Sequence, residues 1–178
     1  MPAALENKIQ IPIGFTNMSG DDLNPIVQED VAVLSPLFEH VVVTTSGQIS
    51  RAPILFLYAH FNEDGFIQGL GPRGVRQIAE GTQARLVVVA SAISGELFQK
   101  AASVPGPKTA NLVFTLSRNQ QYFGAFFKAL FERMRDGEDM LMAWVQLAPQ
   151  GPVQRTDIPA TILIAEAGKL IFPRPPAN

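Results

Sequence analysis

Cysteine is absent from the 178-residue chain, and this absence excludes several kinds of chemistry. A chain without thiols has no disulfide, no thiolate metal ligand and no cysteine nucleophile. Histidine is scarce as well, because His40 and His60 are the two in the sequence. Two histidines without cysteine do not supply the ligand set of a typical zinc site. We therefore expect no metal site, and no motif in the chain indicates a cofactor.

An excess of positive charge is also lacking. The chain has 14 Lys and Arg against 16 Asp and Glu, for a net charge of −2, so we do not expect it to neutralise nucleic-acid phosphates. No apolar run approaches the ~20 residues of a membrane span. The first segment, "MPAALENKIQ", lacks the basic start and apolar centre of a signal peptide. We expect a cytoplasmic protein that does not bind membranes.

The chain has the composition of a globular domain. Hydrophobic residues make up 47% of the chain and charged residues 17%, as in proteins with a packed core. The length suits one domain. We expect a single domain over residues 1–172 and a proline-rich tail over 173–178, where the sequence reads "PRPPAN".

Short apolar runs alternate with helical patterns along the chain. The inner runs lack the polar alternation of a half-solvated strand, which is typical of strands covered on both faces. This order predicts a three-layer α/β domain, with a mostly parallel sheet between two layers of helices. We expect strands at 8–16, 40–47, 52–60, 84–92 and 110–118, helices at 26–38, 71–82, 95–103, 121–135 and 138–148, and a closing strand pair within 160–172.

Two strands carry unusual residues where they end. The run 52–60 ends in His60, and the run 84–92 ends in Ser91 and Ala92. Function in such sheets gathers at the C-terminal ends of the strands. If the two strands are neighbours, His60 and Ala92 face one crevice. His60 is then a candidate general base, and the alternative is a histidine that is hydrogen-bonded for structure alone.

Polar residues next to these tips are candidates for binding. Glu63 and Asp64 could orient His60, bind a cation or solvate a loop, of which the last is favoured. Ser91 and Ser94 carry hydroxyls, but "ASAISG" does not fit the G-x-S-x-G pattern of a serine nucleophile. Together with Phe61, these four residues form the predicted binding set.

The two tips and the segments after them resemble the caspase-like CHAT domains of bacteria. The likeness rests on "PILFLYAH" (53–60), "LVVVASAISG" (86–95), the tract 112–139 and the closing segment 157–168. It extends over most of the chain from about Asn24. By this resemblance His60 occupies the catalytic histidine position, and Ala92 occupies the position of the nucleophilic cysteine.

The resemblance implies a pseudoprotease, because a methyl group cannot attack a carbonyl carbon. Phe61 also departs from the family, in which a glycine after the histidine lets a backbone N–H reach the oxyanion. Loss of one oxyanion donor costs ~10²–10³ in rate. The implied function is binding of a protein or peptide partner in signalling, with pairing of two copies through a sheet edge as a further expectation.

Two other hypotheses remain open at this stage. The chain could be a cysteine endopeptidase altered to alanine at Ala92, although Phe61 and the lack of other cysteines favour natural decay. It could instead be a flavodoxin-like or receiver-like domain that binds a small ligand at the same edge. Asp21 and Asp22 could form the acidic pair of a receiver, but neither inner strand ends in aspartate.

Overall fold

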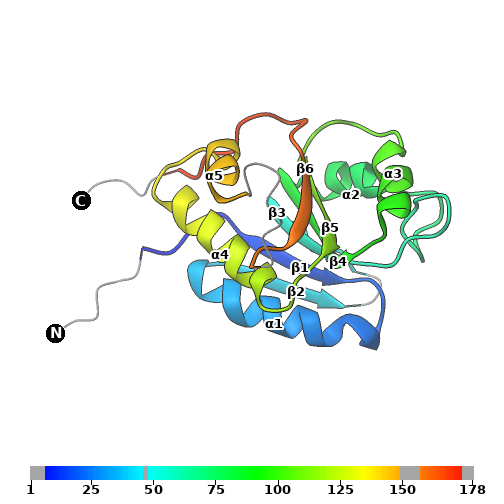
Figure 1. Cartoon of the computed structure of the whole chain (residues 1–178), viewed down its shortest axis with the longest axis horizontal. Coiled ribbons are helices and arrows are strands. Elements are labelled where there is room, and N and C mark those ends of the chain that lie inside the picture. Colours follow the sequence, from blue (N-terminus) through cyan, green and yellow to red (C-terminus); the bar gives the residue numbers. More distant parts are fainter. Residues whose placement is uncertain (1–6, 46–47, 149–156, 174–178) are drawn as a thin grey trace.

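The structure is a computed structural model that describes residues 7–45, 48–148 and 157–173. Its centre is a six-stranded sheet with the order β2-β1-β3-β4-β5-β6 (Figure 1). The first five strands are parallel, and β6 runs antiparallel to β5. The strands are β1 (Ile13–Asn17), β2 (Val41–Thr45), β3 (Ile54–Tyr58), β4 (Leu86–Ala92), β5 (Asn111–Ser117) and β6 (Ala160–Ile164).

Helices cover both faces of this sheet. On one face lie α1 (Asn24–Leu34), α4 (Tyr122–Arg135) and α5 (Met140–Leu147), and on the other lie α2 (Val75–Thr82) and α3 (Gly95–Ser103) (Figure 1). The short 3₁₀ helices η1 (Asp21–Leu23) and η2 (Ser35–Leu37) flank α1. The predicted three-layer α/β architecture is confirmed.

The inner strands show why the sequence lacked polar alternation there. Every residue of β3 is buried, because successive side chains point to opposite faces and both faces are covered. Phe56 points toward α4, where its ring meets that of Phe127 edge to face at 5.3 Å. Leu55 and Leu57 belong to the core under α2 and α3. The phenylalanines of α4 therefore pack in the core on one face of the sheet.

The closing strand pair was predicted wrongly, because only its first half is a strand. β6 pairs with β5, and residues 169–172 form no strand. The backbone of Leu170 instead binds the start of α5, where its N–H donates to Asp139 Oδ1 at 3.1 Å and its carbonyl accepts from Met140 at 2.9 Å. The apolar spacing of Leu170 and Phe172 reflects burial beside α4 and α5.

Of the predicted proline-rich tail, residues 174–178 lie outside the described residues.

No helix among the described residues combines the length and the hydropathy that crossing a membrane requires.

Candidate functional site

The order in which strands are added to the sheet reverses between β1 and β3, although the two strands are parallel. It passes from β1 to the edge strand β2 and then returns to the other side of β1 as β3. The carboxyl ends of strands at such a reversal form a crevice where α/β proteins bind ligands. The residues that follow β1 and β3 meet at this edge.

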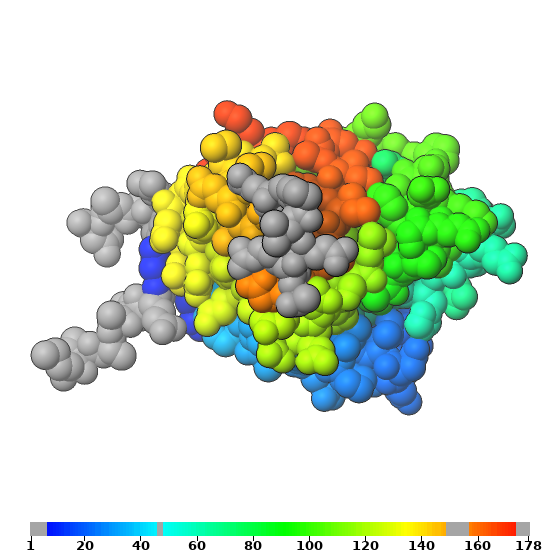
Figure 2. All heavy atoms as spheres, in the orientation of Figure 1, coloured from blue at the N-terminus to red at the C-terminus, as the bar shows by residue number. Residues whose placement is uncertain are grey.

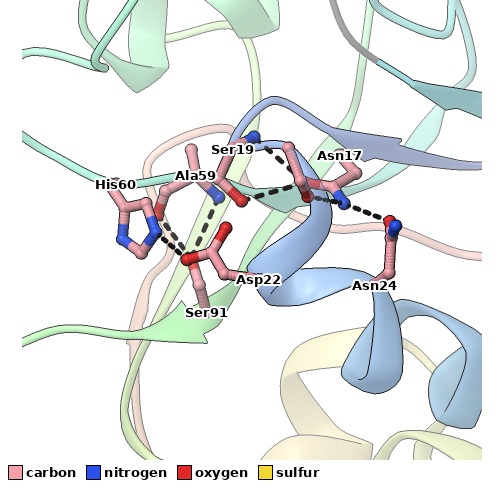
Figure 3. A network of polar contacts seen from close by, with 8 residues as sticks. Asn17, Ser19, Asp22, Asn24, Ala59, His60 and Ser91 are labelled. Atoms are coloured by element: carbon pink, nitrogen blue, oxygen red, sulfur yellow. Dashed lines mark hydrogen bonds and ion pairs between the residues drawn. The ribbon is translucent and has the colours of Figure 1, made fainter.

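The register of β3 and β4 brings the two predicted tips together. Residues 54–57 of β3 pair with the residues 32 positions later in β4, and Ala59 and Ser91 keep the same spacing beyond the paired segment. Ser91 Oγ donates to the Ala59 carbonyl at 2.7 Å and accepts from the Ala59 N–H at 3.1 Å (Figure 3). The next residues are His60 and Ala92, and both are exposed. β3 and β4 are therefore parallel neighbours that end at one edge, which is the condition that the sequence interpretation of His60 and Ala92 required.

Asp22 is the partner of His60 in this site. His60 Nε2 lies 2.6 Å from Asp22 Oδ2, and the two side chains are 47% and 56% exposed (Figure 3). The hydrogen bond from His60 lowers the pKa of the Asp22 carboxyl from its ordinary value. Among the described residues, no hydrogen bond or ion pair joins His60 to Glu63 or Asp64, which the sequence offered for this role, and both are exposed.

A network around Asn17 holds Asp22 in place. The Asn17 side chain, at the end of β1, donates to the Gly20 carbonyl at 2.9 Å and to Asn24 Oδ1 at 2.7 Å. Its own oxygen accepts from the backbone N–H and the hydroxyl of Ser19, both at 3.0 Å (Figure 3). These bonds fix the loop from β1 to α1, and with it the position of Asp22.

The two serines near the tips are committed to structural hydrogen bonds. Ser91 is buried and both of its contacts go to Ala59. Ser94 is exposed and caps α3, since its Oγ accepts from the Leu97 N–H at 3.1 Å. Neither hydroxyl is hydrogen-bonded to His60, so the site lacks the serine–base contact that nucleophilic catalysis needs.

A cleft of about 440 Å³ opens beside the tips, between the loop after β3 and α3. Figure 2 shows this loop in cyan and α3 in green, side by side at the right of the molecule. Phe61 is buried in the cleft wall, whereas Glu63 and Ser94 are exposed at its mouth. The cleft is lined by Phe61, Asn62, Glu63, Ser94, Glu96, Leu97 and Lys100.

Gly65 closes the loop against α3. Its φ of +84° lies in the left-handed region, which disfavours any side chain. A Cβ on Gly65 would come within 2.5 Å of the backbone carbon of Lys100. The loop therefore packs directly on the helix backbone, and the cleft is lined by residues from these same two segments.

A buried charged cluster lies under the same edge. Arg118 binds both oxygens of Asp30, at 2.6 and 3.0 Å, and Tyr58 donates its hydroxyl to Asp30 at 2.6 Å. Arg118 also donates to the Ala90 carbonyl at 2.9 Å, two residues before Ala92. Its guanidinium carbon lies 4.0 Å from the centre of the Phe123 ring. The cluster ties α1, β3, β4 and α4 together beneath the tips.

Burial sets the acid–base properties of this cluster. Burial raises the pKa of the Asp30 carboxyl, and the hydrogen bonds from Arg118 and Tyr58 oppose that rise. Burial and the charge of Asp30 raise the pKa of the Tyr58 phenol well above its usual 10.0. Sequence reasoning missed the cluster, because its members lie far apart in the chain and Arg118 had no distinguishing motif.

The comparisons with known proteins give no further assignment. No protein-family model, curated protein or solved structure matches the chain. Across residues 7–45, 48–148 and 157–173, His, Asp and Glu side chains form no group of three that could hold a metal ion.

Proposed function

We propose that this chain is a catalytically inactive, caspase-like module that binds a protein or peptide segment at the carboxyl ends of β3 and β4. One observation carries the proposal: His60, two residues after β3, is paired with Asp22 at 2.6 Å and lies at the same sheet edge as the exposed Ala92 that ends β4. Covalent catalysis needs a sulfur or oxygen nucleophile next to the base, and Ala92 offers a methyl group. The edge keeps an oriented imidazole and lacks the reacting atom.

The adjoining cleft supports a role in binding. Its volume of about 440 Å³ falls within the ~300–1,000 Å³ typical of ligand sites. Phe61 and Leu97 supply apolar surface, and Glu63 and Glu96 supply charge at the rim. The Glu96 carboxylate lies 3.9 Å from the Lys100 ammonium group. A peptide that presents one apolar side chain and one cationic side chain suits this lining.

The absence of cysteine makes a selective experiment simple. Lys100→Cys would introduce the chain's sole thiol on the lining of the cleft, where an environment-sensitive dye can be attached and both carboxylates remain. Met142→Cys, on an exposed position of α5, provides the matched control. We expect peptides selected from a random library to change the fluorescence of the cleft-labelled protein and not of the control, without being cleaved. A library that yields no such peptide contradicts the proposal.

A second candidate is a cysteine endopeptidase in which alanine has replaced the nucleophile. The His60–Asp22 pair favours it, because a base oriented by a third group is the usual companion of a cysteine nucleophile. Reading codon 92 of the native gene shows whether the natural residue is alanine or a cysteine that was replaced. If alanine is native, an Ala92→Cys protein that cleaves peptides would show that the rest of a peptidase site survives.

A third candidate is a small-ligand domain of the flavodoxin or receiver type. The reversal of the strand order between β1 and β3 favours this candidate, because small ligands bind at such points in α/β sheets. Here the residues at that point are Asp22 and His60. A melting-temperature screen with nucleotides and flavins tests this function, since a ligand at 100 times its Kd stabilises by ~2.7 kcal/mol.

A further inference from the structure

A second concave surface lies on the α2 side of the sheet, away from the tips of β3 and β4. We call it the arginine groove, and it has a volume of about 510 Å³. Arg51 comes from the segment before β3, Arg73 from the loop before α2, and α2 itself forms the far wall. It shares no lining residue with the cleft beside the tips.

The two arginines of this groove have no partner within the described part of the chain. Both are exposed, and no carboxylate or carbonyl there accepts a hydrogen bond from either guanidinium. By contrast, Arg76 and Arg118 are each paired with a carboxylate through two hydrogen bonds. In a chain of net charge −2, two unpaired guanidinium groups on one groove create a local preference for an anion. Glu80 is the one acidic residue of the lining.

The floor between the arginines is apolar and fixed. Ile78 is buried, and Ile49 and Leu70 pack on the same core. The side chain of Gln77 is held at both ends, accepting from the Gly74 N–H at 2.8 Å and donating to the Pro105 carbonyl at 2.7 Å. The groove therefore combines a preformed apolar surface with charge at its rim.

Gly81 adds an independent observation. It does not end the helix, because α2 continues to Thr82 and its left-handed cap is Gln83, with φ of 58°. Gly81 has no left-handed φ, and a Cβ there would meet nothing within 4 Å. Glycine weakens a helix relative to alanine, and nothing around Gly81 requires it. A bare stretch of helix on a groove lets the backbone of a ligand approach closely.

We propose that the arginine groove binds a partner-protein segment in which an acidic side chain lies next to an apolar one. The planar guanidinium groups of Arg51 and Arg73 match a carboxylate with two parallel hydrogen bonds. The apolar side chain then packs on Ile49, Leu70 and Ile78, and the segment's backbone passes over Gly81. This site does not depend on the function proposed for the tips of β3 and β4.

Fluorescence anisotropy with the whole chain tests the proposal. The probe is a short labelled peptide in which glutamate alternates with leucine. The groove variant is Arg51→Gln with Arg73→Gln, and the control is Lys128→Gln with Arg135→Gln, which removes two positive charges from α4 on the other face of the sheet. We expect the groove variant to bind at least about tenfold more weakly than the wild type, because it loses charge-assisted hydrogen bonds. The control should bind as the wild type does.

Two further peptides and one further variant make the test specific. A peptide with glutamine in place of glutamate should not bind, and one with serine in place of leucine should bind more weakly than the probe. Gly81→Ala should raise the melting temperature, because it favours the helix, and should weaken peptide binding. Equal affinity of the groove variant and the control would overturn the proposal, as would equal affinity for the glutamate and glutamine peptides. Equal binding of the serine peptide would contradict the apolar contact, and unchanged affinity after Gly81→Ala would contradict the backbone path.

Discussion

Tyr58 shows how its surroundings set the chemistry of a single residue. It ends β3, is fully buried, and donates its hydroxyl to Asp30 at 2.6 Å. Burial and the neighbouring carboxylate both disfavour the phenolate, so the pKa of Tyr58 lies well above its usual 10.0. In the unfolded chain the same phenol ionises near its usual pKa.

This difference predicts a loss of stability in alkali. Above about pH 10 the unfolded chain releases the Tyr58 proton and the folded chain keeps it, so the free energy of unfolding falls as the pH rises. The chain has two tyrosines, so Tyr122→Phe leaves Tyr58 as the sole source of tyrosinate absorbance. We expect that absorbance to appear together with unfolding. A phenolate that forms while the circular dichroism remains native would contradict the account.

Gly65 carries a second prediction at the residue scale. Gly65→Ala places a Cβ in the left-handed region and within 2.5 Å of the α3 backbone. We expect it to lower the free energy of unfolding by about 2–4 kcal/mol, from backbone strain and overpacking. Denaturant titration measures the change.

The matched control for this prediction is Gly95→Ala. Gly95 begins α3, has no left-handed φ, and a Cβ there would meet nothing within 4 Å. Its replacement should leave stability within about 0.5 kcal/mol of the wild type or raise it slightly. Equal losses for the two variants would show that the contact between the loop and α3 is not the cause.

The site residues differ in how far the sequence could reveal them. The position of His60 and Ala92 at one sheet edge could be predicted, because each follows an apolar run and the carboxyl ends of parallel strands lie at one edge. Asp22 could not be assigned to His60, because the two are separated by 38 positions and the contact depends on how the loop after β1 folds. The burial of the Ser91 hydroxyl could not be foreseen either, since it depends on the pairing of β3 and β4.

At the scale of elements, Arg118 connects three secondary structures through one side chain. It pairs with Asp30 of α1, donates to Ala90 of β4, and lies against Phe123 of α4. Asp30 is fully buried, so it relies on this pair to compensate its charge. The cluster therefore fixes how α1 and α4 sit on the sheet beneath the candidate site.

Breaking this pair predicts a large loss of stability. Arg118→Met leaves Asp30 buried without its counter-charge, and removing one partner of such a pair costs about 3–5 kcal/mol. Adding Asp30→Leu to Arg118→Met should restore much of that loss, because the uncompensated charge disappears. Denaturant titration of the single and double variants measures both effects. A single variant as stable as the wild type would contradict the structural role of the pair.

The same scale shows which elements the sequence predicts well. α3 spans Gly95–Ser103 as expected, because Ser94 caps its start. The inner strands were predicted from their continuous apolar runs. Residues 169–172 were wrongly predicted as a strand because Leu170 and Phe172 have the alternating spacing of one. The backbone conformation of this segment is set instead by its contacts with α4 and α5.

For the whole molecule, the order of the strands explains where the candidate site lies. The reversal between β1 and β3 sets Asp22 beside His60, and the next strand, β4, brings Ala92 to the same edge. At that edge both His60 and Ala92 are exposed. The sequence predicted the layers, but the strand order depends on long-range pairing that a local pattern does not encode.

The most direct test of the account is the reactivity of a thiol placed at Ala92. In a chain without cysteine, Ala92→Cys provides a single reactive group whose rate with iodoacetamide reports its thiolate fraction across pH. A nearby imidazole lowers the pKa of a thiol. We predict a depressed thiol pKa in Ala92→Cys, and a return to the ordinary value of about 8.5 when His60→Gln is added. A thiol pKa that is the same with and without His60, and equal to that of the exposed control Met142→Cys, would contradict the claim that His60 and position 92 form one site.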